Sequence, residues 1–207
     1  RQGKAVGLFE ARGRLGGRIL SVSAGSGLAL DLGPTWFWPD TQPLVKSLVA
    51  ELELADIPQH DDGSMLHLSD PEKTPERIIG KKPHEGARRL QGGMAQLIDA
   101  LAADFPLGLL HLGHVLTDVC DRGDHVALVF AAGDETVAFN ARRVVLAAPP
   151  RLLEQQVRFE PDLDEVTRDA MRSAETWMAA QAKVVIAYDR AFWREAELDL
   201  AVRLPDD

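Results

Sequence analysis

The sequence predicts an α/β protein in which short buried strands alternate with amphipathic helices. An apolar run over residues 4–10 ends at Glu10, as expected for a buried strand. Apolar residues then recur with helical spacing over 42–54 and again after Gly92-Gly93. A second apolar run, residues 142–150, stops at two prolines and predicts a fully buried parallel strand.

The first half of the chain predicts a β-ribbon followed by a helix. Residues 19–23 and 27–31 flank an Ala-Gly-Ser-Gly turn and are expected to pair as two strands. Asp40 or Thr41 is expected to cap the helix over 42–54. The apolar face of that helix comprises Leu44, Val45, Leu48, Val49 and Leu52.

The middle of the chain predicts a loop region and a second helix. Residues 55–87 carry four prolines and many charges, so we expect loops with one short strand at Ser64–Leu68. The Gly92-Gly93 pair is expected to open a helix. Its apolar residues are Met94, Leu97, Ile98, Leu101 and Phe105.

The second half predicts a meander and then a further helix and strand. Turn residues separate three expected strands, near 109–120, 125–130 and 135–139. Asp162 is expected to cap a helix over 163–173, and residues 181–189 are expected to form another strand.

Composition excludes several classes of protein. The 207 residues suffice for one large or two small domains, and no 18-residue apolar run predicts a membrane span. The net charge of −9, with no basic stripe, argues against nucleic-acid binding. The single cysteine, Cys120, rules out an internal disulfide and suits a reducing compartment, so we expect a cytoplasmic protein. The six histidines lack metal-ligand spacing, so no metal site is expected.

The segment after the first predicted strand suggests a dinucleotide site. Glu10 stands where an acid that binds the adenosine ribose belongs. Gly16 and Gly17 would allow the backbone to approach a pyrophosphate, and Arg18 could clamp it. Only nine residues precede Glu10, and they hold no glycine-rich turn, so we expect the chain to start after the first βα unit. Alternatively, Glu10 ends an ordinary strand and the glycines form a turn.

Residues 6–33 resemble the flavin amine oxidase family, which includes monoamine, polyamine and L-amino acid oxidases. The resemblance covers essentially the whole chain, as the middle of a longer enzyme, and implies FAD as the cofactor. It implies a Rossmann-like FAD/NAD(P)-binding domain interleaved with an α+β substrate domain. The FAD domain would comprise 1–57 and 88–155, without its first βα unit, and the partial substrate domain 58–87 and 156–207.

The same resemblance assigns the cofactor-binding residues. They are Glu10, Ala11, Arg12, Gly16, Gly17, Arg18, Gly33, Pro34, Thr35, Trp36 and Val115. The stretch from Gly33 would pass its backbone along the pyrophosphate, ribityl chain and flavin ring, and the backbone of Val115 would contact the adenine edge. Trp36 and Trp38 would line the substrate side; alternatively, they are core tryptophans beside a turn.

Lys183 is the candidate catalytic residue. It begins a segment that ends in Phe192-Trp193, and the family has a lysine at this place that reaches flavin N5 through a water. A lysine there would favour negative charge on the reduced ring, and its pKa can fall on burial. The alternative is a lysine that simply extends into solvent from the end of a strand.

The resemblance implies FAD-dependent oxidation of a small-molecule amine to an imine, by hydride transfer to N5 and reoxidation by dioxygen. A related FAD-dependent desaturase, of the carotenoid or protoporphyrinogen type, is the alternative enzyme. An inactive truncated scaffold is the alternative outside the enzymes, and for residues 1–207 alone we expect weak or no FAD binding. The sequence does not indicate the oligomeric state.

Overall fold

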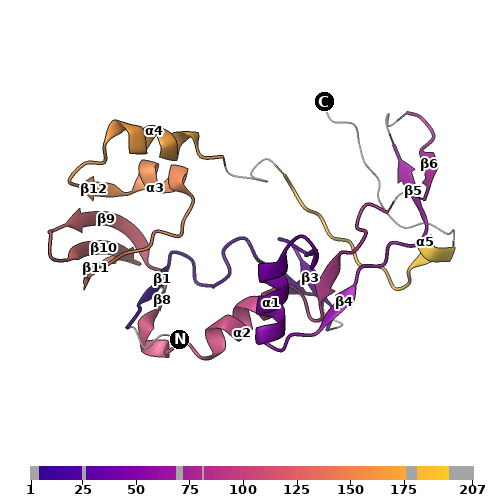
Figure 1. The fold of residues 1–207 in the computed structure, drawn as a ribbon, viewed down its shortest axis with the longest axis horizontal. Coiled ribbons are helices and arrows are strands. Elements are labelled where there is room, and N and C mark those ends of the chain that lie inside the picture. The colour runs from indigo at the N-terminus through magenta and orange to yellow at the C-terminus, as the bar shows by residue number, and fades with distance from the viewer. Residues whose placement is uncertain (1–4, 25–26, 69–71, 81, 176–180, 196–207) are drawn as a thin grey trace. The chain divides into compact units, whose positions relative to one another are not determined.

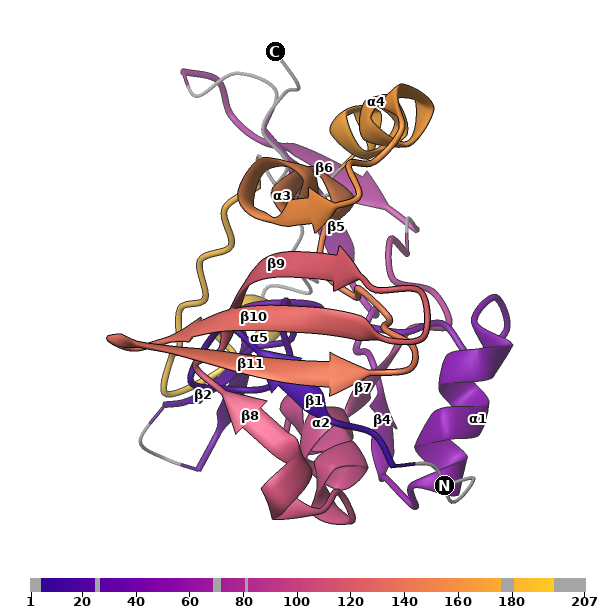
Figure 2. The ribbon, with the colours of Figure 1, turned by 90° about the vertical axis from the view of Figure 1, so that its left-hand side faces the viewer.

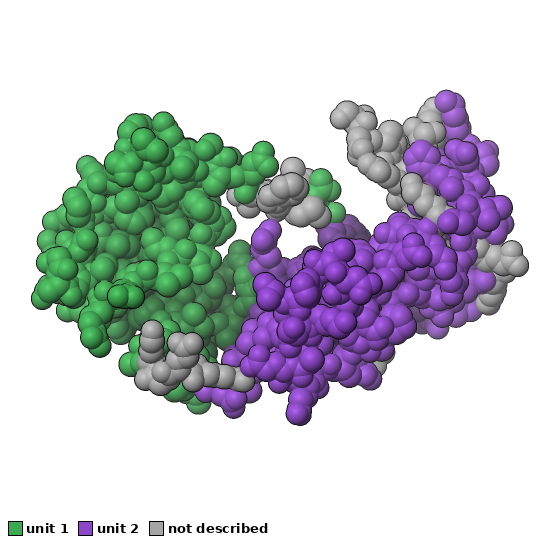
Figure 3. Space-filling model, in the orientation of Figure 1, with its two compact units in different colours: residues 1–17, 105–182 green, residues 18–104, 183–207 purple. Residues whose placement is uncertain are grey.

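The computed structural model describes residues 5–24, 27–68, 72–80, 82–175 and 181–195. They group into two compact units, each built from two separate stretches of chain (Figures 1 and 3). Unit 1 comprises residues 1–17 and 105–182, and unit 2 comprises residues 18–104 and 183–207. The predicted assignment to a cofactor and a substrate domain stays a prediction.

Unit 1 holds a parallel strand pair and a four-stranded sheet. The parallel pair is β1 (Leu8–Glu10) with β8 (Leu110–Leu112), the latter preceded by a 3₁₀ turn over Leu107–Leu109. The sheet has the order β11-β10-β9-β12 (Figure 2). Its strands are β9 (Val115–Asp121), β10 (Val126–Ala132), β11 (Glu135–Ala141) and β12 (Arg158–Glu160).

The meander of β9, β10 and β11 is antiparallel, as predicted, and β12 joins β9 in parallel. Phe9 on β1 stacks on Phe130 of β10, with 4.4 Å between ring centroids. Phe130 is buried together with Leu128 and Cys120, so apolar side chains join the parallel pair to the sheet.

Two helices complete unit 1: α3 (Pro150–Gln156) and α4 (Glu165–Ser173). Arg172 of α4 forms an ion pair with Glu154 of α3 at 2.9 Å. The cap of α4 is Asp164, not the predicted Asp162, because the Asp164 carboxylate accepts the Thr167 N–H at 2.9 Å.

Unit 2 consists of strand pairs and helices. The predicted ribbon is confirmed as the antiparallel pair β2 (Ser21–Ser23) and β3 (Ala29–Asp31). The other pairs are β4 (Asp56–Pro58) with β7 (Arg88–Leu90), and β5 (Ser64–His67) with β6 (Glu76–Ile79). The helices are α1 (Pro43–Glu51), α2 (Ala95–Ala103) and the single turn α5 (Phe192–Glu195).

A small core packs α1, β7 and α2 of unit 2 together. It comprises the buried Phe37, Val49, Leu90 and Met94, with Ile19, Val45, Leu54 and Leu97 packed against them. Leu44 was expected on the inner face of α1 but is 85% exposed. Neither Asp40 nor Thr41 caps α1. Gln42 is the N-cap residue, but its side chain makes no capping bond to the helix, and Pro43 occupies the first turn, where its missing N–H costs nothing.

The segments 142–150 and 181–189 were expected as strands. Residues 142–149 and 181–189 form no strand, and Pro150 already belongs to helix α3. Val145, in the middle of the first run, is 89% exposed. A strand needs a hydrogen-bonded neighbour, and among the described residues no strand pairs with either segment. The prolines at 149–150 begin helix α3 rather than merely ending a strand.

Other boundaries also differ from expectation. The first strand covers only Leu8–Glu10. The region 55–87 contains β4 and β6 in addition to the strand expected at Ser64–Leu68, which is observed as β5. Of the helices in the described part of the chain, none has the length and apolar character needed to cross a membrane.

Candidate functional site

Hydrogen bonds to the side chain and to the backbone carbonyl of Glu10 hold the loop after β1 in place. The Arg12 N–H donates to Glu10 Oε1 at 2.8 Å, and the Glu10 carbonyl accepts the His114 N–H at 3.0 Å. The Arg12 carbonyl accepts the Gly113 N–H at 3.0 Å. Among the residues that the structure describes, no donor contacts Glu10 Oε2, so this oxygen remains available for a ligand hydroxyl.

Two glycines close this loop in conformations that side chains disfavour. Gly16 and Gly17 have φ values of 98° and 54°. The Gly17 carbonyl accepts from Arg12 Nη1 at 3.1 Å and from Arg14 Nη2 at 2.8 Å. Arg14 was not singled out from the sequence, because nothing in its spacing distinguishes it from the neighbouring arginines.

The remaining loop residues are accessible. Ala11, Arg12 and Arg18 are exposed, and Val115 begins β9 with 43% of its surface exposed. Glu10 to Gly17 and Val115 therefore come together inside unit 1. Arg18, the stretch 33–36 and Lys183 lie in unit 2.

Gly33 lies directly over the start of the ribbon. A Cβ atom at this position would collide with the Arg18 carbonyl oxygen and lie 3.2 Å from the Leu20 nitrogen. The Leu32 N–H donates to the Leu20 carbonyl at 2.8 Å, which holds the two backbones together. Only glycine fits here without displacing the backbone of residues 18–20.

Lys183 contacts the stretch that the sequence assigned to the cofactor. Its Nζ donates to the Gly33 carbonyl at 3.0 Å and to the Thr35 hydroxyl, and lies 5.5 Å from the centroid of the Trp36 ring. Thr35 is buried, and Pro34 between these partners is exposed. The structure thus brings Lys183 into contact with the predicted residues Gly33, Thr35 and Trp36, which precede it by about 150 positions in the chain.

The environment of Lys183 holds its pKa below the ordinary value. Partial desolvation of the ammonium is the main cause. The Asp31 carboxylate opposes this shift and raises the pKa, whereas the positive charge of Arg89 lowers it further. Although Lys183 is exposed as a residue, its ammonium is therefore sensitive to two charges from the core of unit 2.

Trp36 connects this cluster to the neighbouring strands. Its Nε1 donates to Gln59 Oε1 at 2.8 Å, and its ring lies 4.4 Å from the His84 ring, centroid to centroid. His84 lies against the buried Asp61, with 3.6 Å from Nδ1 to Oδ1. Trp36 is therefore half-buried among polar partners rather than a purely apolar core residue. Trp38 is half-buried too, and its N–H donates to Gln42 Oε1 at 3.0 Å.

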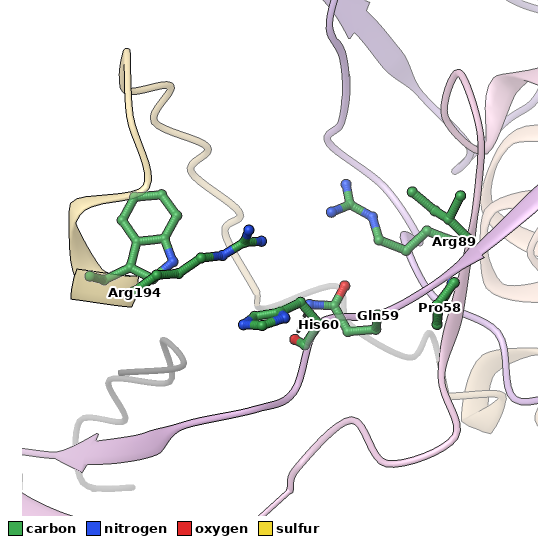
Figure 4. A pocket seen from close by; sticks show the side chains of 7 residues that line it. Pro58, Gln59, His60, Arg89 and Arg194 are labelled. Carbon is green, nitrogen blue, oxygen red and sulfur yellow. Dashed lines mark hydrogen bonds between the residues drawn. The ribbon is translucent and has the colours of Figure 1, made fainter. Parts of the chain in front are cut away.

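A pocket of about 310 Å³ lies beside Gln59 (Figure 4). Its lining comes from β4, the residues that follow it, β7 and α5. The lining residues are Ile57, Pro58, Gln59, His60, Arg89, Trp193 and Arg194. The sequence singled out only the Phe192-Trp193 pair here, as part of a family motif, and gave no sign that Arg89 and Arg194 share a cavity.

Asp31 is a further buried group that the sequence did not reveal. Its Oδ1 accepts the Met94 N–H at 2.8 Å and the Ser21 hydroxyl, and Ser21 Oγ accepts the Ala95 N–H at 3.0 Å. Gly93 has a φ of 89°, and a Cβ atom added to it would lie 3.0 Å from Ser21 Oγ. Gly93 therefore allows the start of α2 to approach the ribbon closely.

Comparison with known proteins gives consistent results. A sequence profile described as flavin containing amine oxidoreductase matches residues 1–78 and 63–207. A search of curated protein sequences returned no match.

Solved structures with the same fold include wild-type putrescine oxidase bound to putrescine, with a TM-score of 0.74 at 17% identity over 98% of this chain and 65% of that one. A triple mutant of putrescine oxidase has a TM-score of 0.69 at 17% identity, over 82% of this chain and 58% of that one. Cyclohexylamine oxidase from Brevibacterium oxydans IH-35A has a TM-score of 0.65 at 16% identity, with the same coverage. The chain thus spans less than two thirds of these proteins.

Proposed function

The chain belongs to the family of flavin-containing amine oxidoreductases, and we propose that it uses FAD to oxidise a small-molecule amine to an imine. The observation that carries the proposal is the contact of Lys183 with Gly33 and Thr35. It joins the candidate catalytic cation to the stretch assigned to the cofactor. The putrescine and cyclohexylamine oxidases among the similar structures also support an amine substrate.

The residues after β1 have the chemistry that FAD requires. The available oxygen of Glu10 suits a ribose hydroxyl, and the glycine conformations at 16 and 17 leave backbone that can approach a pyrophosphate. A Cβ at Gly17 would have no heavy atom within 4 Å, so the space beside it is open. Arg18 would contribute a positive charge and Ala11 and Arg12 the adjoining backbone, while Val115 would contact the adenine through its own backbone.

In unit 2, Gly33, Pro34, Thr35 and Trp36 would line the flavin end of the cofactor. When bound, FAD would supply the acceptor for a hydride from the α-carbon of the amine, with dioxygen as the final electron acceptor. The Lys183 ammonium would hold a water molecule beside the flavin. Within the described part of the chain, Gly33 and Thr35 accept two of its three N–H bonds, which leaves one for a water molecule.

We also propose that residues 1–57 and 88–155 form a Rossmann-like FAD-binding domain. Residues 58–87 and 156–207 would then belong to an interleaved substrate domain. The parallel pairing of β1 with β8, about 100 positions apart, supports a sheet of this kind.

Stopped-flow measurement with Lys183→Met tests the role of the lysine. We expect the rates of flavin reduction or reoxidation to fall by at least tenfold, while Lys46→Met, which removes an exposed cation from α1, leaves both rates unchanged. Wild-type rates in Lys183→Met would remove Lys183 from the mechanism. If no tested amine bleaches the flavin in the unsubstituted protein, the proposed amine oxidation is contradicted.

A further inference from the structure

The pocket beside Gln59 has a distinctly basic lining. Arg89 lies on β7 and Arg194 on α5, and Figure 4 shows their side chains extending into the pocket from opposite sides. His60 adds an imidazole, and none of the lining residues is acidic. A cavity with two guanidinium groups and no carboxylate is suited to an anion.

Neither guanidinium is neutralised within the described part of the chain. The structure shows no hydrogen bond or ion pair from the side chain of Arg89 or Arg194 to any described residue. The neighbouring Arg88 differs, because its guanidinium binds Asp56, with 2.7 Å from Nε to Oδ1. The nearby acid on β4 is thus already engaged, and no other described residue offers a carboxylate to Arg89 or Arg194.

The pocket is connected to the Lys183 cluster inside unit 2. Gln59 lines the pocket and also accepts the indole N–H of Trp36, whose ring lies beside the Lys183 ammonium. The charge of Arg89 also reaches Lys183, since it contributes to the low pKa of that lysine. A molecule in the pocket would therefore lie next to the residues proposed to act on an amine.

We propose that Arg89 and Arg194 form a subsite for a carboxylate carried by the amine substrate. This inference rests on the proposed function and narrows its substrate class to amines that bear an anionic group, such as amino acids. The planar guanidinium fork matches the two oxygens of a carboxylate. Trp193, Ile57 and Pro58 provide apolar surface for the carbon skeleton next to that group.

Matched substrate pairs test this subsite in the flavin-loaded protein. Phenylalanine and 2-phenylethylamine differ only in the carboxylate, as do leucine and 3-methylbutylamine. We expect Arg89→Gln and Arg194→Gln each to lower kcat/KM for the amino acids by about 10- to 100-fold, as for loss of a charge-assisted hydrogen bond. The values for the matched amines should stay within about twofold in Arg194→Gln; in Arg89→Gln they should fall by less than the amino-acid values, because that substitution also acts on the pKa of Lys183. Arg143→Gln, which removes an exposed cation elsewhere, should change neither.

A binding measurement separates this inference from the proposed oxidation. 3-Phenylpropionate carries the carboxylate but no amine, and calorimetry can follow its binding without turnover. We expect Arg89→Gln and Arg194→Gln to weaken this binding by at least tenfold. If no amine bleaches the flavin but this loss is seen, the subsite stands and the oxidase function fails.

Other results would overturn the subsite. Equal losses on an amino acid and its matched amine would indicate a structural role for the arginines. Unchanged 3-phenylpropionate binding in both variants would show that no carboxylate is held there. Weakened binding of FAD, with 3-phenylpropionate binding unchanged, would assign the guanidinium groups to the cofactor phosphates instead.

Discussion

The Asp31 carboxylate accepts the backbone N–H of Met94 at 2.8 Å, and so a buried acid of the ribbon caps the start of helix α2. Asp31 is only 4% exposed and also accepts the Ser21 hydroxyl, which in turn accepts the Ala95 N–H. A strand pair and a helix more than 60 residues apart are thereby joined through one side chain. The same carboxylate raises the pKa of Lys183, so one acid both caps α2 and acts on the Lys183 ammonium.

Asp31→Ala should therefore destabilise unit 2. It leaves the Met94 N–H and the Ser21 hydroxyl without their acceptor, which costs about 1–3 kcal/mol for a buried site. Denaturant unfolding would measure the change. Asp31→Asn keeps a carbonyl oxygen at the same place and should lose less than half as much; equal losses in both variants would show that the negative charge, not the cap, matters.

The pKa of Lys183 should respond in opposite directions to its two charged neighbours. Arg89→Gln removes a positive charge and should raise this pKa, whereas Asp31→Asn removes a negative charge and should lower it. NMR titration of the lysine side chain would report both shifts. Shifts of the same sign in the two variants would contradict the charge arrangement described above.

The free energy of unfolding should depend on pH through Lys183. Because its pKa is lower when folded, the unfolded chain binds more protons between the folded pKa and the ordinary lysine value. The free energy of unfolding should therefore rise as the pH increases through that interval. Lys183→Met should flatten this rise, measured by chemical denaturation at several alkaline pH values, and an identical slope in both proteins would argue against the shift.

Gly33→Ala should destabilise unit 2 through a backbone collision. The added Cβ would meet the Arg18 carbonyl oxygen, so the start of the ribbon must move, and overpacking of this kind costs about 1–3 kcal/mol. Gly108→Ala is the matched control, because a Cβ there has no heavy atom within 4 Å and its φ is ordinary. Thermal unfolding of the two variants should differ; similar melting temperatures would mean that the ribbon can yield without cost.

Asp118 in unit 1 should contribute to acid sensitivity. Its pKa lies below the ordinary value because of the Thr117 hydroxyl bond, together with the bond and charge of Arg158. A carboxyl group with a lowered pKa stabilises the fold above its unfolded pKa, and that stability is lost as the pH falls through the folded pKa. Asp118→Asn should therefore reduce the difference in stability between pH 7 and pH 3, followed by denaturant unfolding at both values.

Local patterns predicted the elements that depend on nearby residues. The ribbon around the Ala-Gly-Ser-Gly turn and the helix after Gly93 follow from glycine placement and apolar spacing, and both are present. The apolar runs at 142–149 and 181–189 have strand-like composition, but composition does not supply a neighbouring strand. The absence of a pairing strand, which the local sequence does not reveal, therefore determines that these two segments are not strands.

The site shows the same division between local and distant information. Family likeness singled out Lys183 and the stretch from Gly33 separately, and the fold shows that they touch. The buried acid at 31, the Asp61–His84 contact and the pair of pocket arginines each depend on residues far apart in sequence. No spacing rule within a single chain reveals such pairs, because only tertiary packing brings them together.

Because each unit is built from two separate stretches of chain, its contacts can form only in a fixed order during synthesis. Strand β1 is made early but must wait for β8, about 100 residues later, before its parallel partner exists. Unit 2 cannot gain its Lys183 contact until all of residues 105–182 have been synthesised. The early ribbon and helix α1 must therefore persist while residues 105–182 of unit 1 are synthesised. Contacts of such long sequence separation form slowly, so strand β1 stays without its parallel partner until residues 110–112 have been made.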